Sequence, residues 1–391
     1  MRIALVVGLC LLPLIAAETA NAADQPKPKP SAQSIRESYR ARLNENTVTI
    51  MAGSSQATDL AVVQDIAAVL DDGDALRVVP MIGKGPTQNL KDVLFMRGVD
   101  MGVTQANVLK YFARTGELGP DLANQVAYIA KLFNEEMHVL ARAEIEDIAA
   151  LSGKTVNIGP EGSGAEITAR LVFEALGITA HEVHLDEADA IAKLNAGEID
   201  ATVVVAGKPA PVFAHLEQAR GLKLLAVPYA KGLEDSYYPA TLSHEDYPHL
   251  IADGERVDTV SVCAVLVSFN WASDSARYRK LDRFVDRFFS NFDAFLAAPR
   301  HPKWQQVNFA ATLEGWQRSP LAQRWIDNAK TTAAADPAAR ERFETFLAQA
   351  DAGAAATDEE RAKLFRAFVE WSKNQNKNRS GSVEPSLWCH A

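Results

Sequence analysis

The chain has 391 residues, which is enough for two or three domains with sizeable cores. It carries 40 lysine and arginine residues against 50 aspartate and glutamate residues, a formal net charge of −10. Because no basic patch or stripe stands out, the sequence lacks the features of a nucleic-acid-binding protein.

The N-terminus predicts export from the cytoplasm. Arg2 precedes an apolar run over residues 3–17, which is too short to span a membrane as a stable helix, and an A-x-A cleavage site ends at Ala22. We therefore expect a secretory signal peptide over residues 1–22 and a periplasmic location. A buried N-terminal helix and a lipid anchor on Cys10 are the alternatives. No later stretch stays apolar for about 18 residues, so we expect no membrane-embedded segment after cleavage.

Residues 23–46 are expected to form a linker and an N-terminal segment. The stretch "DQPKPKP" should be extended, and residues 31–42 could form a short polar helix. Beyond it, apolar strand patterns alternate with helical patterns. The strands are expected at 47–53, 76–83, 99–105, 126–133 and 136–142, and the helices between them at 58–72, 87–98 and 106–115.

The same alternation continues through a second block. Strands are expected at 155–159, 181–185 and 199–207, helices at 165–176 and 187–197, and two more apolar strands at 221–228 and 259–268. This order predicts an α/β protein with mostly parallel sheets.

We expect lobe 1 to comprise 47–135 plus 226–300, and lobe 2 to comprise 136–225. Residues 301–391 are expected to be a helical C-terminal extension packed on one lobe. The amphipathic stretch 358–373 could instead dock a partner.

A glycine-rich loop over residues 159–164, "GPEGSG", joins an expected strand to a strong helix pattern. Its glycine spacing does not fit a dinucleotide fingerprint, and no Gly-Lys-Ser/Thr follows as a P-loop requires. Ser163 and Glu166 have the spacing of a capping box, which places Ser163 at the helix start. Such a start offers free backbone N–H groups and attracts anions in general.

Four stretches, taken together, resemble the TAXI-type solute-binding proteins of TRAP transporters. They are "TVTIMAGSS" (47–55), "GKGPTQNLKDVLFMRGVDMGVTQANVL" (83–109), "LSGKTVNIGPEGSGAEITARLVFEALGI" (151–178) and "LNAGEIDATVVVAGKPAPV" (194–212). The pattern G-K-x-V-x-x-G-x-x-G-S-G at 153–164 is the most specific of them, and the resemblance covers about 47–270.

The resemblance implies a two-lobed periplasmic-binding-protein type II fold with a cleft between the lobes. It further implies that a small organic anion, either a dicarboxylate or an acidic amino acid, is held there and passed to TRAP membrane permease subunits. The strand–helix order agrees with this, because ligands of open α/β sheets bind beyond the carboxyl ends of the strands. A periplasmic sensor that docks a membrane receptor kinase is the alternative function.

The candidate ligand-binding residues are polar groups and glycines at expected strand ends. Hydroxyls, side-chain amides and helix-start N–H groups suit a carboxylate, and a lysine could pair with one. Each could instead serve only as a helix cap or a surface group. The candidates are Ser54, Ser55, Gln88, Asn89, Gln105, Ser163, Gly164, Ala165, Gly207 and Lys208. Glu161 could hold a ligand ammonium, although a solvated loop charge is the simpler interpretation.

Catalysis and metal binding find no support in the residue pattern. His181 and His184 are three residues apart rather than in H-E-x-x-H spacing, and on a strand they would face opposite sides. Ser163 has no nearby base to activate it, so we expect neither an enzyme, nor a cofactor, nor a metal site. Cys263 falls in an expected buried strand and should be a core thiol, although a disulfide with Cys389 is the alternative.

Overall fold

The computed structural model describes residues 31–334, except 56, 215 and 217–220. The expected signal peptide, Cys389 and the amphipathic stretch 358–373 lie outside the described residues. The first helix, α1 (Ala32–Asn46), has no buried residue, which agrees with the expected polar helix. Within the described part of the chain, no helix is both long enough and apolar enough to cross a membrane.

Lobe 1 is built on parallel strands covered by helices. Strands β1 (Thr47–Ala52), β2 (Arg77–Ile82) and β3 (Met101–Gln105) are adjacent in the order β2-β1-β3. The intervening helices are α2 (Thr58–Leu70), α3 (Pro86–Phe95), α4 (Ala106–Thr115) and the short α5 (Leu122–Gln125). These elements match the alternation that the apolar periodicity predicts.

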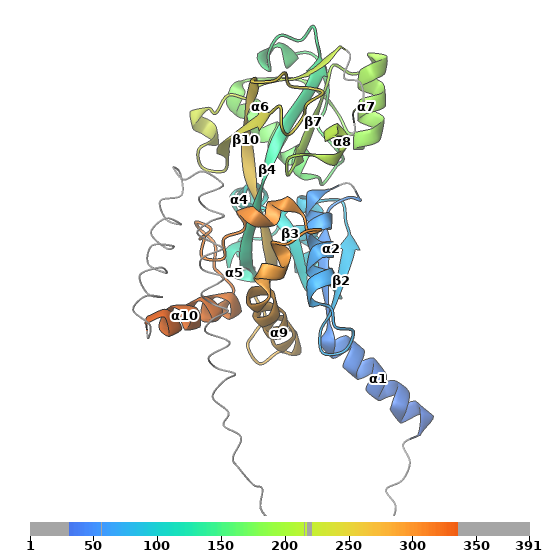
Figure 1. Cartoon of the computed structure of the whole chain (residues 1–391), viewed down its shortest axis with the longest axis vertical. Coiled ribbons are helices and arrows are strands. Elements are labelled where there is room, and N and C mark those ends of the chain that lie inside the picture. The colour runs from blue at the N-terminus through green and yellow to red at the C-terminus, as the bar shows by residue number, and fades with distance from the viewer. Residues whose placement is uncertain (1–30, 56, 215, 217–220, 335–391) are drawn as a thin grey trace, which may run out of the picture. The chain divides into compact units, whose positions relative to one another are not determined.

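Two long antiparallel strands run from one lobe into the other (Figure 1). They are β4 (Val126–Arg142) and β10 (Arg256–Phe269). The sequence predicts two strands, 126–133 and 136–142, where the structure has the single strand β4. The pairing explains the difference, because Asn134 and Glu135 continue the ladder opposite Cys263 and Val262. Cys263 is buried in β10, as expected of a core thiol.

Lobe 2 extends the sheet beyond β4 in the order β4-β7-β5-β6. Its parallel strands are β5 (Thr155–Asn157), β6 (His181–Val183) and β7 (Ala201–Ala206). Its helices are η1 (Ala149–Leu151), α6 (Gly164–Leu176), α7 (Glu187–Ala196) and the short α8 (Pro211–Ala214) and η2 (Lys231–Leu233). Two further strands, β8 (Leu222–Leu224) and β9 (Tyr238–Ser243), pair with β4 and β10 respectively.

The segment after β8 belongs to lobe 2, which corrects the expected division of the chain. Leu225, Leu233 and Tyr237 are buried in the core that contains Val156 of β5. Strand β9 pairs with residues 256–261, the part of β10 that lies in lobe 2. The chain therefore returns to lobe 1 only along β10, because β10 spans both lobes and its apolar residues fill a different core at each end.

The segment after β10 completes the core of lobe 1. It contains α9 (Ala276–Ser290), η3 (Phe292–Phe295), η4 (Pro302–Gln306) and α10 (Pro320–Ala334). Trp304 is fully buried, with its ring centroid 4.4 Å from that of Phe295 and 6.0 Å from that of Phe288. Residues 301–334 are thus part of lobe 1 rather than a separate extension, because their aromatic side chains fill its core. The two-lobed α/β architecture expected from the sequence is confirmed.

Candidate functional site

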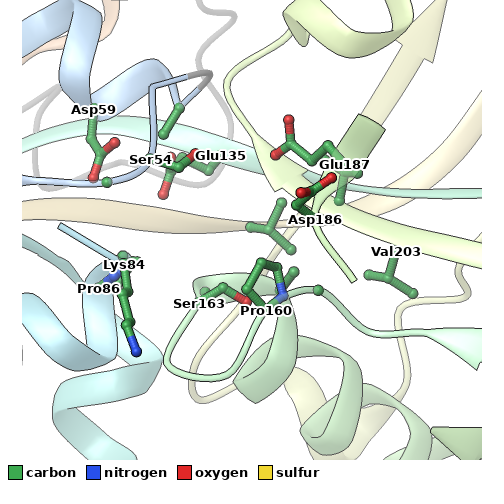
Figure 2. A pocket seen from close by; sticks show the side chains of 18 of the residues that line it. Ser54, Asp59, Lys84, Pro86, Glu135, Pro160, Ser163, Asp186, Glu187 and Val203 are labelled. Atoms are coloured by element: carbon green, nitrogen blue, oxygen red, sulfur yellow. The ribbon is translucent and has the colours of Figure 1, made fainter. Parts of the chain in front are cut away.

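A cavity of about 330 Å³ lies between the two lobes. This volume falls within the usual range for small-molecule sites. Figure 2 shows Asp59, Ser54 and Glu135 on one side of it and Asp186 and Glu187 on another. Its lining comprises Gly53, Ser54, Ser55, Ala57, Asp59, Lys84, Gly85, Pro86, Gln105, Glu135, Asn157, Gly159, Pro160, Ser163, Gly164, Ala165, Asp186, Glu187, Ala188 and Val203 to Val205.

The position of the cavity follows from the topology of the sheet. Lobe 1 contributes the loops that follow β1 and β2 and the last residue of β3, and lobe 2 contributes the loops that follow β5 and β6. The first residues of α2, α3, α6 and α7 therefore border the same space. This is the crevice beyond the carboxyl ends of parallel strands where ligands of α/β sheets bind.

The start of α6 is capped as the sequence predicts. Ser163 Oγ accepts a hydrogen bond from Glu166 N at 3.2 Å. Glu166 Oε2 in turn accepts from Gly162 N at 2.7 Å, one residue before the backbone N–H that the standard capping box uses. The N–H groups of Gly164 and Ala165 lie in the first turn, where a helix supplies no acceptor of its own. Both residues line the cavity.

Glycines allow the two lobes to approach each other closely at this point. Gly85 has a φ of 130°, and a Cβ placed on it would lie 3.1 Å from the Cα of Ser163 in the other lobe. A Cβ on Gly164 would lie 2.5 Å from the side-chain amide of Gln105. The backbones of the two lobes therefore meet where a larger residue would hold them apart.

Six of the predicted site residues lie in the cavity lining. They are Ser54, Ser55, Gln105, Ser163, Gly164 and Ala165. Gln105 comes from the end of β3 in lobe 1, and its Nε2 donates to Glu135 Oε2 at 2.6 Å. The structure thus brings the first loop, the end of β3 and the start of α6 together, as ligand binding between the lobes requires.

The two other predicted residues of lobe 1 lie outside the lining and hold secondary structure in place. Asn89 is fully buried, and its Nδ2 donates to the carbonyl of Val103 at 2.8 Å. Gln88 Nε2 donates to Asp92 Oδ1 at 2.8 Å along α3. The amide N–H groups of both residues therefore serve within lobe 1, because α3 packs against β3 at this point, while Asn89 Oδ1 is buried without a partner.

The two predicted residues that follow β7, Gly207 and Lys208, also lie outside the lining. Gly207 N donates to Thr58 Oγ1 at 3.1 Å and so connects the two lobes. Lys208 Nζ contacts Asp246 Oδ2 at 3.0 Å and the carbonyl of Thr241 at 2.7 Å. Lys208 therefore pairs with a carboxylate of lobe 2 instead of facing the cavity. Glu161, on the loop before α6, is exposed and also lies outside the lining.

Four of the five charged side chains in the lining are carboxyl groups, a feature that the sequence-based candidates did not include. Asp59 is 3 % exposed and Glu135 is 5 % exposed. Burial raises the pKa of Asp59, and the nearby N–H groups of Gly53 and Leu60 offset this only in part. Burial raises the pKa of Glu135 most, and the neighbouring Asp59 charge raises it further. The hydrogen bond from Gln105 lowers this pKa and offsets the rise only in part.

On the lobe 2 side, Asp186 and Glu187 open α7. Asp186 is the N-cap residue and accepts a hydrogen bond from Asp189 N at 2.9 Å. Burial raises the pKa of Glu187, and the Asp186 charge adds to this effect. Both residues lie at the start of α7, the positive end of the helix dipole, where acidic side chains are common.

Glu135 and the adjacent Glu136 have different environments because successive residues of a strand point to opposite faces. Glu136 Oε1 pairs with Lys303 Nζ at 2.6 Å, and its Oε2 accepts from Lys208 N at 2.8 Å. Lys303 is 2 % exposed, so this ion pair is buried. Glu135, on the other face, lines the cavity. The sequence signal was present, because two neighbouring acidic residues interrupt a long apolar run at 126–142.

Comparison with known proteins identifies the family of the chain. A model of the NMT1-like family matches residues 50–314, well over half of the chain. Among solved structures, the aliphatic sulphonate binding protein SsuA from Escherichia coli is 14% identical, with 77% of this chain and 93% of that chain covered and a TM-score of 0.41. MatC from Rhodopseudomonas palustris with bound malate is 15% identical, with coverages of 64% and 87% and a TM-score of 0.41.

A third solved structure, the periplasmic VFT2 domain of Bordetella pertussis BvgS, is 12% identical, with coverages of 68% and 97% and a TM-score of 0.38. Identities this low do not bear on the ligand. The family match and the two-lobed fold confirm the coarser expectation, a solute-binding protein of the periplasmic type. The finer assignment to TAXI proteins of TRAP transporters stays a prediction.

Proposed function

We propose that this chain, which belongs to the NMT1-like family, captures a small solute bearing a carboxylate in the cavity between its lobes and delivers it to a membrane permease. The observation that carries the proposal is the cavity itself, which both lobes line and the start of α6 borders. Following the TAXI resemblance, the permease would be of the TRAP type and the solute an organic acid or an amino acid.

The start of α6 suits the anionic end of such a solute. The N–H groups of Gly164 and Ala165 lie at the positive end of a 13-residue helix, and both residues line the cavity between the lobes. A helix start is not sufficient evidence alone. Asp59 Oδ1 and Gln105 Oε1 provide a second indication that the cavity holds a ligand, because both are buried in the lining without a hydrogen-bond partner; as acceptors they would face a donor group of the solute and not its carboxylate.

Binding without chemistry is part of the proposal. Ser163 Oγ accepts from Glu166 N as a helix cap, which is a structural use of the hydroxyl. The proposal therefore requires that a bound solute be recovered unchanged. Closure of the lobes would then serve capture and release, as hinged two-lobed binding proteins do.

A thermal-shift screen of the purified exported chain against organic acids, amino acids and neutral sugars tests the proposal. A specific ligand at 100 times its Kd should stabilise the folded protein by about 2.7 kcal/mol. Calorimetry then gives the Kd, and mass spectrometry checks that the solute is unchanged. Stabilisation by neutral sugars with no response to any carboxylate would refute the proposal.

Uptake measurements address the role in transport. Deleting the gene should abolish uptake of the identified solute, and supplying the chain should restore it. Uptake that survives deletion, accompanied by loss of a solute-dependent transcriptional response, would support the sensor alternative instead.

A further inference from the structure

We infer that the lobe 1 wall of the cavity is a binding site for a protonated amine, so that the captured solute carries an ammonium group as well as its carboxylate. The inference rests on the proposed function and specifies its ligand class. It follows from three side chains, Asp59, Gln105 and Glu135, which come from separate elements and all line the cavity.

These side chains present hydrogen-bond acceptors without donors. Asp59 Oδ1 and Gln105 Oε1 are buried and accept no hydrogen bond within the described structure. Gln105 is only 1 % exposed, and its Nε2 donates a hydrogen bond to Glu135 Oε2 at 2.6 Å. The amide is thereby fixed with its oxygen as the free group. Buried acceptors are normally satisfied, so their convergence on one cavity indicates a guest that supplies N–H donors.

Within the described part of the chain, no lysine, arginine or histidine forms an ion pair with Asp59 or Glu135, although the charge of Lys303 acts on Glu135 and lowers its pKa. Lys303 is a buried lysine, but its Nζ lies 2.6 Å from Glu136 Oε1 and 3.3 Å from Gln306 Oε1. Among the described residues that line the cavity, Lys84 is the one with a cationic side chain, and it is exposed. Figure 2 shows that side chain extending away from Asp59 and Glu135. Two carboxyl groups are thus gathered without an ion-pair partner. Burial raises the pKa of both in the unliganded protein, and a bound cation would favour their ionised forms.

An ammonium group matches this arrangement better than a second carboxylate does. A primary ammonium has three N–H donors and no acceptor, and Asp59, Gln105 and Glu135 each offer an acceptor. A dicarboxylate would place its second negative charge near Asp59 and Glu135. The wall therefore selects amino acids and related zwitterions over dicarboxylates of similar size, while the start of α6 serves the carboxylate of either class.

Matched ligand pairs provide the test on the wild-type chain. Calorimetry compares each L-amino acid that stabilises the protein with the acid in which hydrogen replaces the amino group, for example L-glutamate with glutarate. We expect the deamino acid to bind about 10- to 100-fold more weakly. Equal affinity within the pairs would overturn the inference and leave the proposed function standing. Failure of every carboxylate to bind would overturn both.

Variants then locate the amine. Asp59→Asn and Glu135→Gln should each weaken the amino compound by about tenfold or more and change the affinity for the deamino acid far less. Glu161→Gln is the control, because it removes the same charge from an exposed position outside the lining. If one variant fails to fold, the other and the wild-type pairs still decide. A loss that is equal for both ligands would contradict the assignment.

Discussion

Replacing Gly164 by alanine should weaken ligand binding by keeping the lobes apart. The added Cβ would lie 2.5 Å from Nε2 and Oε1 of Gln105 and 2.7 Å from its Cδ. This is roughly 1 Å short of ordinary carbon contact distances. Gln105 cannot easily move, because it is 1 % exposed and hydrogen-bonded to Glu135. Since Gly164 belongs to lobe 2 and Gln105 to lobe 1, separation of the lobes relieves the contact most directly.

Overpacking of this kind costs about 1–3 kcal/mol. If the cost falls on closure, the Kd rises about 5- to 150-fold. Opening of the lobes in the unliganded protein would relieve the contact, so its unfolding free energy should fall by much less than the binding free energy. The variant should therefore separate affinity from stability.

Calorimetry with the identified solute measures the affinity, small-angle scattering of the liganded form measures the closure of the lobes, and urea unfolding of the unliganded protein measures the stability. Gly232→Ala is the matched control, because its Cβ would come no closer than 3.4 Å to Ala175. Wild-type affinity in Gly164→Ala would refute the reasoning. So would a drop in the unfolding free energy as large as the loss in binding.

Two further predictions concern buried charges. Because burial raises the pKa of both Asp59 and Glu135, the folded protein binds more protons than the unfolded chain, so stability without ligand should fall as pH rises above about 4 until both groups ionise. Lys303 and Glu136 also act on Glu135, so the measurement compares the unfolding free energy in urea, as a function of pH, between wild type and Asp59→Asn. The substitution should make the fall with pH less steep. Parallel curves of unfolding free energy against pH would contradict the prediction. Separately, Lys303→Met should cost about 3–5 kcal/mol in unfolding free energy by leaving Glu136 buried and unpaired. Adding Glu136→Gln should recover part of that loss, and a single variant as stable as wild type would disprove the role of the pair.

Local patterns in the sequence determined the elements and several positions of the site. The period-2 and period-3.6 apolar patterns give β1 to β3 and α2 to α4 within a few residues. The cap on α6 was readable because Ser163 and Glu166 interact within one turn. The strand-to-helix loops that line the cavity follow from the same alternation, since parallel strands bring their carboxyl ends to one edge.

Contacts distant in sequence decided the rest. The assignment of residues 226–262 to lobe 2 depends on β9 pairing with one end of β10, and both strands carry apolar patterns that fit either lobe. Which of Glu135 and Glu136 faces the cavity depends on the register of β4, because a shift of one residue exchanges the two faces.

The acidic wall is likewise a product of tertiary structure. Asp59 opens a helix, Gln105 ends a strand and Glu135 lies in the middle of another. Each side chain taken alone has an ordinary local interpretation. Packing within lobe 1 and against the start of α6 in lobe 2 removes them from water together, and it leaves Asp59 Oδ1 and Gln105 Oε1 without a hydrogen-bond partner. That combination turns three separate polar residues into a candidate ligand site.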